Sequence, residues 1–175
     1  MTSFTCPDLV ADALPMPVQL PSDAAFPPIE AILPHRGTML LLDGLIACGD
    51  DSVEASAHVW PDAWYADASG AMPAWFGIEL MAQTIAARIG LVALRAGGET
   101  LPGVLLGSQR YRANVPAFAA GAALRIRAQE LLRTDDGIGA YQCTISSQGD
   151  VWADAIIKAF QPRDFQSFIE GSFRS

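Results

Sequence analysis

The sequence predicts an α+β domain in which an antiparallel sheet of about five to six strands wraps around one long apolar helix. Three observations lead to this prediction. Residues 74–94 are almost all apolar or small, so a helix there would be buried around most of its circumference. The residues after Gly98 read as strands separated by short turn signals. The chain has 175 residues, of which 51% are apolar and 17% charged, and this suits one folded domain with a proper core.

An extension precedes this domain. Residues 1–27 are rich in proline, which breaks any long element, and we expect the domain itself over residues 28–162. The remaining residues, 163–175, should form a short peripheral tail.

The first half of the domain should contain a short helix and two strands. Residues 28–33 can form a helical turn, which Pro34 should stop. Residues 39–43 are a short apolar run of the kind that becomes a strand buried on both faces. Residues 52–59 alternate apolar and polar side chains, which predicts a strand with one buried face.

The long helix follows a loop over residues 60–72. Pro73 suits the first position of a helix, where its missing N–H is not needed, and Gly97 with Gly98 provides a C-terminal stop. Four strands should follow, over residues 104–113, 123–132, 139–146 and 151–160. One buried helix wrapped by antiparallel strands is the arrangement called the hotdog fold, and such domains generally pair into dimers.

Composition argues against several classes of function. The net charge is −8, so the basic footprint of a nucleic-acid-binding protein is missing. Three cysteines, Cys6, Cys48 and Cys143, are scattered without metal-binding spacing, and only two histidines are present. We therefore expect no metal, no cofactor and a reducing compartment. The cytoplasm is the default expectation because no secretory signal is evident.

The apolar run over residues 75–94 also reaches the length of a membrane span. It contains Glu79, Gln83 and Arg88, and each of these is costly to place in a bilayer. The prediction is therefore a buried core helix and no membrane span.

Glu79 is the feature of this helix that points to chemistry. It is the only acidic residue between Asp67 and Glu99, and it lies within the first two turns of an apolar helix. At about 100° per residue Gln83 falls on the same face, whereas Arg88 falls on the opposite face. Burying an ionised carboxylate is costly, so such a residue is either a functional acid or a structural group held by nearby donors.

Three motifs resemble one family of enzymes. Residues 29–43 (IEAILPHRGTMLLLD) are similar to the opening of the 3-hydroxyacyl-acyl-carrier-protein dehydratases of the FabZ type. Residues 73–83 (PAWFGIELMAQ) look like the family's central-helix motif, in which a Glu lies six residues after a Pro and begins Glu-x-x-x-Gln. Residues 106–116 (LGSQRYRANVP) resemble its strand leading to a Pro turn. The similarity spans residues 28–160, and it is to a divergent branch, the dehydratase-like proteins found beside aryl-polyene and similar synthase systems.

The chain departs from the main branch of that family at two points. The main branch has a catalytic His in a Gly-His-Phe-Pro-Gly loop about fourteen residues before the Glu, and residues 62–70 of this chain contain no His. Ala74 also stands where the family usually has Gly. The usual pair of catalytic residues is therefore incomplete in this chain.

The resemblance implies dehydration of 3-hydroxyacyl thioesters carried by an acyl carrier protein or by phosphopantetheine. Glu79 would be the acid that protonates the leaving hydroxyl. The amides at the helix start, around Ala74 to Gly77, would polarise the thioester carbonyl, and Gln83 is a further substrate-binding candidate.

The base could come from three sources. His35 lies in an irregular turn before a core strand and has suitable chemistry, because imidazole titrates near neutrality; a structural, hydrogen-bonded His is the alternative. His58 falls on the polar face of its strand and is expected to face solvent. A partner subunit could also supply the missing His, because hotdog dehydratase sites lie at the dimer interface. We expect a homodimer or a heterodimer with a paralogous hotdog subunit.

Four arginines are expected on two neighbouring strands: Arg110, Arg112, Arg125 and Arg127. Such a patch would suit the phosphate of phosphopantetheine or an acidic carrier protein, with Arg110 and Arg112 as substrate-binding candidates. The alternative is a solvated sheet face with ordinary salt bridges.

Two other functions remain consistent with the sequence. A hotdog thioesterase can use a carboxylate on the central helix to activate water, although the Leu-Pro-His-Arg motif argues against it. A catalytically silent subunit that supports an active partner would explain the missing loop His. The sequence also leaves open whether four apolar side chains line an acyl tunnel or form core: Trp60, Trp75, Phe76 and Met81.

Overall fold

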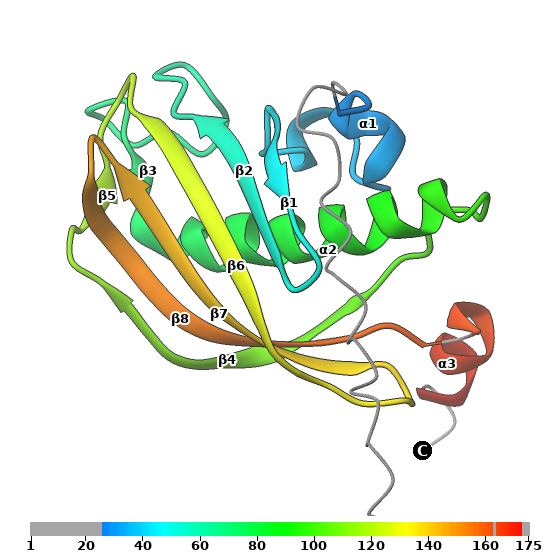
Figure 1. Cartoon of the computed structure of the whole chain (residues 1–175). Coiled ribbons are helices and arrows are strands. Elements are labelled where there is room, and N and C mark those ends of the chain that lie inside the picture. Colours follow the sequence, from blue (N-terminus) through cyan, green and yellow to red (C-terminus); the bar gives the residue numbers. More distant parts are fainter. Residues whose placement is uncertain (1–25, 163, 173–175) are drawn as a thin grey trace, which may run out of the picture.

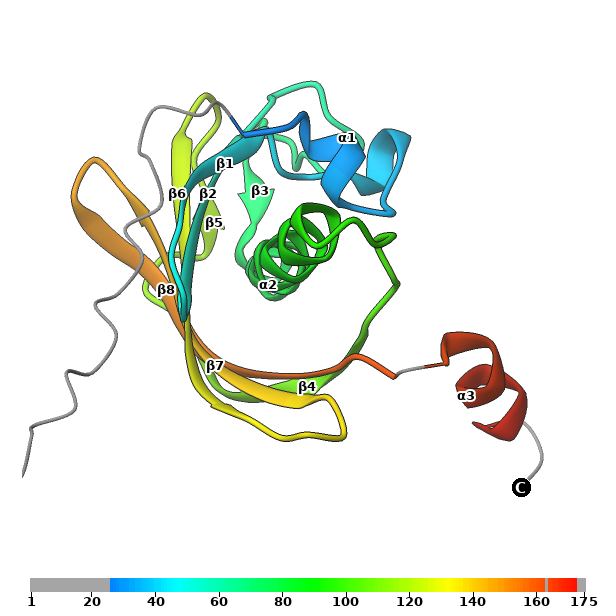
Figure 2. The ribbon, with the colours of Figure 1, turned by 45° about the vertical axis from the view of Figure 1, so that its right-hand side comes forward.

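The computed structural model describes residues 26–162 and 164–172, so most of the predicted N-terminal extension, residues 1–25, lies outside the described part of the chain. One long helix lies in the hollow of a strongly curved sheet (Figure 1 and Figure 2). This arrangement confirms the predicted hotdog fold.

The helices and strands follow one another in nearly the predicted order. They are α1 (Ile29–Ile32), the 3-10 helix η1 (Gly37–Met39), β1 (Gly44–Cys48), β2 (Ser52–His58), β3 (Met72–Pro73), the 3-10 helix η2 (Ala74–Phe76), α2 (Gly77–Arg95), β4 (Val104–Ala113), β5 (Ala117–Phe118), β6 (Ala123–Arg133), β7 (Ile138–Ser147), β8 (Asp150–Phe160) and α3 (Phe165–Ser172). Six strands form one antiparallel sheet in the spatial order β1-β2-β6-β7-β8-β4, and β3 pairs with β5. The segment predicted to be a tail contains α3.

The predicted strand over residues 39–43 is wrong. The first residue of this run belongs to η1, and the strand begins only at Gly44. Two backbone groups of this run bond to a side chain of α2: Leu41 N–H donates to Gln83 Oε1, and the Met39 carbonyl accepts from Gln83 Nε2. The run bonds to the sheet at its end, where Asp43 N–H donates to Ser56 O on β2 over 2.8 Å. An apolar run that reads as a strand therefore lies along the central helix.

The predicted alternation of β2 is confirmed. Val53, Ala55 and Ala57 are buried, and the residues between them are only half-buried. β2 pairs with β6 along its whole length without a shift in register. The apolar face of both strands can therefore pack against α2.

α2 is the centre of the core. Leu80, Met81 and Ile85 are enclosed by the sheet and the covering loops. By length and composition, the segment 74–95 is the one described helix that could cross a membrane, with a mean hydropathy of 1.4. More than half of that stretch, 56%, is buried within the fold, as expected for the central helix of this architecture.

α1 packs across α2 at a position where the long helix has no side chain. A Cβ on Gly90 would collide with the carbonyl oxygen of Ile32, so only glycine allows this close approach. Ile29 and Ile32 are buried in the contact. The chain then runs back along α2 towards its first turns, and this path brings His35 to Glu79.

Arg88 ties α2 to the sheet on the side away from Glu79, in agreement with the predicted helix faces. Its side chain is almost completely buried, and Nη1 lies 3.1 Å from Glu130 Oε2 on β6. Nη2 donates to the carbonyl of Asp50 in the turn between β1 and β2. A buried guanidinium needs such partners, so this contact anchors the helix as well as satisfying the charge.

β4 is an outer strand of the sheet and has β8 as its sheet neighbour. Its register against β8 shifts twice, and the second shift lies between Gln109 and Arg112. Arg110, within this bulge, has a φ of +54°. A bulge changes which side chains face inward, and here Tyr111 is half-buried while Arg110 and Arg112 are exposed.

Candidate functional site

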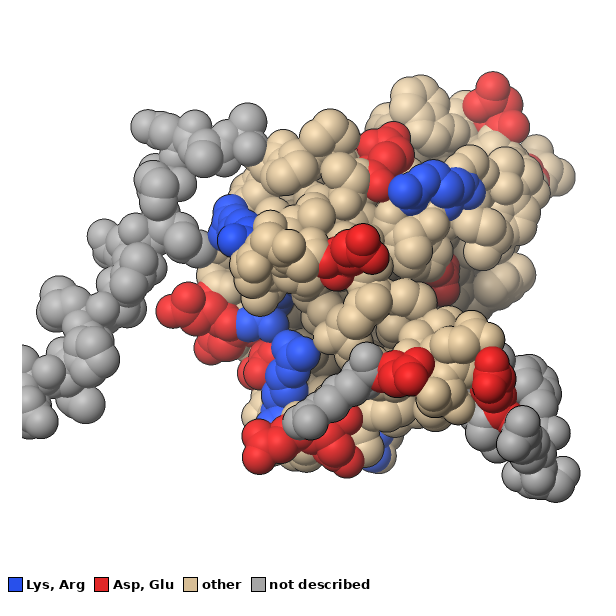
Figure 3. Space-filling view, turned by 90° about the vertical axis from the view of Figure 1, so that its right-hand side faces the viewer, with Lys and Arg blue, Asp and Glu red and all other residues tan. Residues whose placement is uncertain are grey.

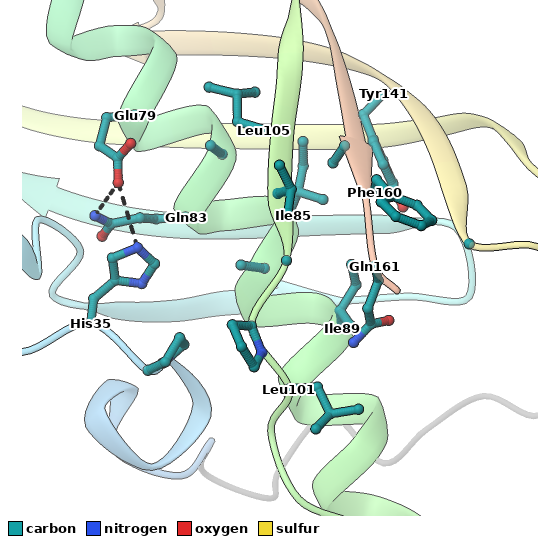
Figure 4. Close-up of a pocket in the computed structure, with 18 of the residues that line it drawn as sticks. His35, Glu79, Gln83, Ile85, Ile89, Leu101, Leu105, Tyr141, Phe160 and Gln161 are labelled. Carbon is teal, nitrogen blue, oxygen red and sulfur yellow. Dashed lines mark hydrogen bonds and ion pairs between the residues drawn. The ribbon is translucent and has the colours of Figure 1, made fainter. Parts of the chain in front are cut away.

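His35 and Glu79 lie side by side in the wall of a cavity (Figure 4). His35 follows α1, Glu79 lies in the first turn of α2, and His35 Nε2 is 3.6 Å from Glu79 Oε1. Gln83, one turn further along α2, donates from Nε2 to the same Glu79 oxygen over 2.8 Å. The shared face of Glu79 and Gln83 is thus confirmed, and the structure adds His35 to it.

Gln83 joins the three segments of this site. The side chain is completely buried, its Oε1 accepts from Leu41 N–H over 3.0 Å, and its Nε2 donates to Met39 O over 2.7 Å as well as to Glu79. An amide can do this because it carries a donor and an acceptor group on one carbon. Glu79 Oε2, in contrast, makes no hydrogen bond or ion pair with any residue that the structure describes.

His35 is not held in the way a structural histidine usually is. Its Nδ1 is buried and has no hydrogen-bond partner within the described ranges, and the contact of its Nε2 is the one with Glu79. The two side chains remain partly open, with 28% of His35 and 35% of Glu79 exposed. Glu79 is thus less buried in this chain than its apolar helix suggests, and solvent or substrate can reach it.

The cavity beside this pair has a volume of about 240 Å³. Its walls come from α2, from residues 101–105, and from the ends of β7 and β8. Most of the side chains are apolar: Ile85, Ala86, Ile89, Leu101, Leu105, Tyr141 and Phe160 (Figure 4). Pockets of this kind hold apolar ligands and orient them through a few polar groups. The arrangement suits an acyl chain whose reacting end lies at Glu79 and His35.

The two predicted carbonyl-binding residues frame the start of α2. Ala74 and Gly77 are both buried, and neither Pro73 nor Phe76 caps its helix with a side chain. The Ala74 amide already donates to Pro116 O over 3.1 Å, and the Gly77 amide donates to the Ala74 carbonyl. Of the two amides between them, Trp75 N–H has no acceptor within this 3-10 turn and is the one left for a ligand.

Tyr111 is a residue of this region that the sequence did not single out. Its hydroxyl donates to the Ala74 carbonyl at the helix start. It lies within the third family-like motif, but its inward direction depends on the bulge in β4, which the sequence pattern does not reveal.

The loop over residues 60–72 contains aromatic side chains where the main-branch dehydratases have their His. Tyr65 stands fourteen residues before Glu79. Its hydroxyl accepts from Trp60 N–H over 3.1 Å and donates to His58 O over 3.4 Å, and its ring packs 5.6 Å from that of Phe76. These contacts stabilise the loop.

Other candidates lie away from the cavity. His58 is on β2, half-buried, with its ring 4.4 Å from that of Trp60. Trp60 and Trp75 are exposed, and Met81 belongs to the core. The acyl-tunnel interpretation of the residues near the helix start is not supported, because neither these three nor Phe76 lines the cavity.

The expectation that the four arginines share two neighbouring strands is wrong. β4 carries Arg110 and Arg112, β6 carries Arg125 and Arg127, and β7 and β8 lie between them. Arg125 and Arg127 pair with Glu54 over 2.8 and 3.7 Å, as ordinary surface salt bridges do. Arg110 and Arg112 are exposed on the outer strand. On the face shown in Figure 3, basic and acidic side chains are intermixed.

Comparison with known proteins agrees with the fold. The family model ApeP-like, described as ApeP dehydratase, matches residues 27–170. A chain of the dehydratase heterocomplex ApeI:P from Xenorhabdus doucetiae is 30% identical over 86% of this chain and 100% of that chain, with a TM-score of 0.80. A search of curated protein sequences gave no match.

More distant structures share the fold alone. The PaaI protein from the phenylacetic acid degradation operon of E. coli is 14% identical over 67% of this chain and 77% of its own, with a TM-score of 0.52. A mutant form of the phenylacetic acid degradation protein PaaI from Thermus thermophilus is 19% identical over 67% of this chain and 90% of its own, with a TM-score of 0.51.

Proposed function

Because the chain belongs to the ApeP-like dehydratase family, we propose that it removes water from 3-hydroxyacyl thioesters on an acyl carrier protein. The products would be trans-2-enoyl thioesters for aryl-polyene or similar chain synthesis. The observation that carries this proposal is the position of Glu79 beside His35 in the wall of an apolar cavity.

His35 and Glu79 each carry out one of the two proton transfers that dehydration requires. Dehydration breaks the Cα–H and Cβ–O bonds and forms a double bond between Cα and Cβ. His35 Nε2 takes the α-proton, and protonated Glu79 gives its proton to the leaving hydroxyl, which departs as water. The proton on His35 then returns to the Glu79 carboxylate, whose Oε1 lies 3.6 Å from His35 Nε2, and the acid is restored once the proton is again on Oε2. Oε2 of Glu79 is the oxygen that faces the substrate, because Oε1 is bound by Gln83.

The start of α2 stabilises the charge that develops on the thioester. As the α-proton leaves, negative charge builds on the carbonyl oxygen, and the Trp75 amide, which has no acceptor within its 3-10 turn, lies in the turn before Glu79. Donors placed in this way are worth about 10²–10³ in rate.

A second hotdog subunit is part of the proposal. The loop at residues 62–70 contains no His, and within residues 26–162 and 164–172 the ten-residue strand β4 has no sheet partner on the side away from β8, so this edge can pair with another chain. The similar chain from X. doucetiae is from a heterocomplex. We infer a paralogous partner that supplies a second histidine or supports the His35–Glu79 pair. Arg110 and Arg112, on the outer strand, would contact the phosphate of phosphopantetheine.

The experiment compares the full chain alone with the chain mixed with the hotdog protein encoded beside it. Hydration of a crotonyl-carrier protein is followed by the loss of enoyl absorbance. Glu79→Gln should lower the rate at least 100-fold, whereas Glu99→Gln, an exposed acid beyond the end of α2, should leave it unchanged.

Other outcomes identify the competing functions. Release of free thiol would indicate a thioesterase, and no activity in either assembly would indicate a silent subunit; both reject the proposal. Full activity of His35→Ala would assign the base to the partner.

A further inference from the structure

Tyr111 contacts the start of α2 from the outer strand of the sheet. Its hydroxyl donates to the carbonyl oxygen of Ala74. The second bulge of β4 makes this contact possible, because the register shift around Arg110 turns Tyr111 inward between two exposed arginines. Arg110 has a φ of +54°, which is uncommon for a residue other than glycine and is concentrated at functional sites.

The helix leaves space for this hydroxyl. A Cβ on Gly77 would collide with the Tyr111 oxygen, and it would also lie 3.1 Å from Ile145 Cδ1 and 3.2 Å from Phe118 Cζ. Burial raises the pKa of Tyr111 to about 12, so the hydroxyl keeps its proton and acts as a donor at neutral pH. The hydroxyl is therefore confined to the space beside Gly77, where it donates to the Ala74 carbonyl.

Holding the Ala74 carbonyl also fixes the next amide. The peptide group is planar, so the direction of the Ala74 carbonyl determines the direction of the Trp75 N–H on the opposite side of the same plane. The Trp75 N–H lies in the first turn, where amides have no acceptor within the helix, and no side chain or loop carbonyl of the described residues accepts a hydrogen bond from it. The Ala74 carbonyl accepts from the Gly77 N–H as well as from Tyr111, so Tyr111 is the side chain, among the described residues, that helps to fix the direction of the Trp75 N–H.

We propose that Tyr111 is a positioning residue for the dehydration, which holds the Ala74–Trp75 peptide so that the Trp75 N–H points at the thioester carbonyl. This inference rests on the proposed function and adds a residue that touches neither the acid nor the base. It also connects the outer strand β4 with the chemistry at the start of α2.

The test is Tyr111→Phe in the full chain, in whichever assembly is active. With crotonyl-carrier protein as substrate, kcat should fall about 10-fold while KM and the melting temperature stay close to those of the wild type, because a donor is misdirected and not removed. Ser147→Ala is the control, since it removes another buried hydroxyl bond to a backbone carbonyl, Ser147 Oγ to Ala123 O over 2.9 Å, which joins β7 to β6 and not to α2. That variant should keep its kcat.

A spectroscopic measurement separates positioning from folding. The carbonyl stretch of ¹³C-labelled crotonyl-pantetheine bound to the protein should move towards its solution frequency in Tyr111→Phe, because its hydrogen bond is weaker. An unchanged kcat, a raised KM with unchanged kcat, or an unchanged stretch in the folded variant overturns the inference. If Glu79→Gln is inactive while Tyr111→Phe is normal, only the positioning role is rejected. If the wild type is inactive in every assembly, the proposed function is rejected with it.

Discussion

Gln83 Nε2 donates to Glu79 Oε1 over 2.8 Å, and this is the same carboxylate oxygen that lies 3.6 Å from His35 Nε2. One oxygen of Glu79 therefore faces the protein, and the other is left for a ligand. The amide that makes this choice also bonds to the backbone on both sides of Leu40, so it positions the acid and the segment after His35 together.

We expect Gln83→Leu to lower the free energy of unfolding by about 3 kcal/mol. The substitution is apolar and of similar size, but it leaves Leu41 N–H, Met39 O and Glu79 without their partner, and each unsatisfied backbone group costs about 1–3 kcal/mol. Chemical denaturation measures the change. Gln142→Leu, at an exposed position of β7, should stay within about 0.5 kcal/mol. Equal losses in the two variants would contradict the role given to Gln83.

Gly90→Ala should weaken both stability and activity although it lies far from Glu79 in sequence. The added Cβ meets the Ile32 carbonyl, so α1 must move away from α2 at a cost of about 1–3 kcal/mol, and His35 moves with it. Thermal unfolding and hydration kinetics test this. Gly44→Ala is a matched control, because a Cβ there meets no atom within 4 Å. A normal kcat in Gly90→Ala would show that the position of α1 does not matter for the reaction.

Arg110→Ala and Arg112→Ala should each raise KM for the carrier-protein substrate by a few-fold and reduce its dependence on salt. Both side chains are exposed on β4, and exposed charges act mainly on encounter, which salt screens. Arg127→Ala is the control, since that arginine lies on β6, away from β4, and already pairs with Glu54. The measurement is KM at low and physiological ionic strength. Identical shifts for all three would mean that only net charge matters.

Ala86→Phe should restrict the length of the acyl chain. Ala86 lies in the cavity wall between Gln83 and Ile89, and an aromatic ring there would fill part of the 240 Å³ space. Crotonyl thioesters should still react, while kcat/KM for longer enoyl thioesters should fall by 10-fold or more, about 1.4 kcal/mol. Val92→Phe adds the same ring to an exposed position of the same helix and should leave chain-length preference unchanged. An equal loss for short and long chains in Ala86→Phe would argue against this cavity as the acyl site.

Much of the helix and its chemistry was predictable because the signals are local. The apolar run with Pro73 before it and two glycines after it defines α2, and helical spacing places Gln83 beside Glu79 and Arg88 on the opposite face. Alternation predicts β2 for the same reason. His35 was a candidate by chemistry alone, and its approach to Glu79 depends on the packing of α1 against Gly90.

The predictions that proved wrong concern parts of the fold that depend on contacts between residues distant in sequence. The segment 39–43 has the composition of a buried strand, but its backbone bonds to Gln83, 42 positions beyond Leu41. The order of strands in the sheet leaves no local trace, so the separation of Arg110 from Arg125 by two strands could not be foreseen. No pattern in the sequence predicts the bulge that turns Tyr111 inward either.

The cavity joins two parts of the molecule that can change independently. Its reactive end belongs to the packed pair α1 and α2, which meet at Gly90, and to the segment after His35, which Gln83 ties to α2. Its far end is formed by residues 101–105 and the ends of β7 and β8. Substitutions in the sheet can therefore alter which chain fits while the acid and its histidine keep their positions. Such a division lets the reaction be retained while the range of substrates changes. Selection can act on the residues that limit the length of the acyl chain without disturbing Glu79 and His35.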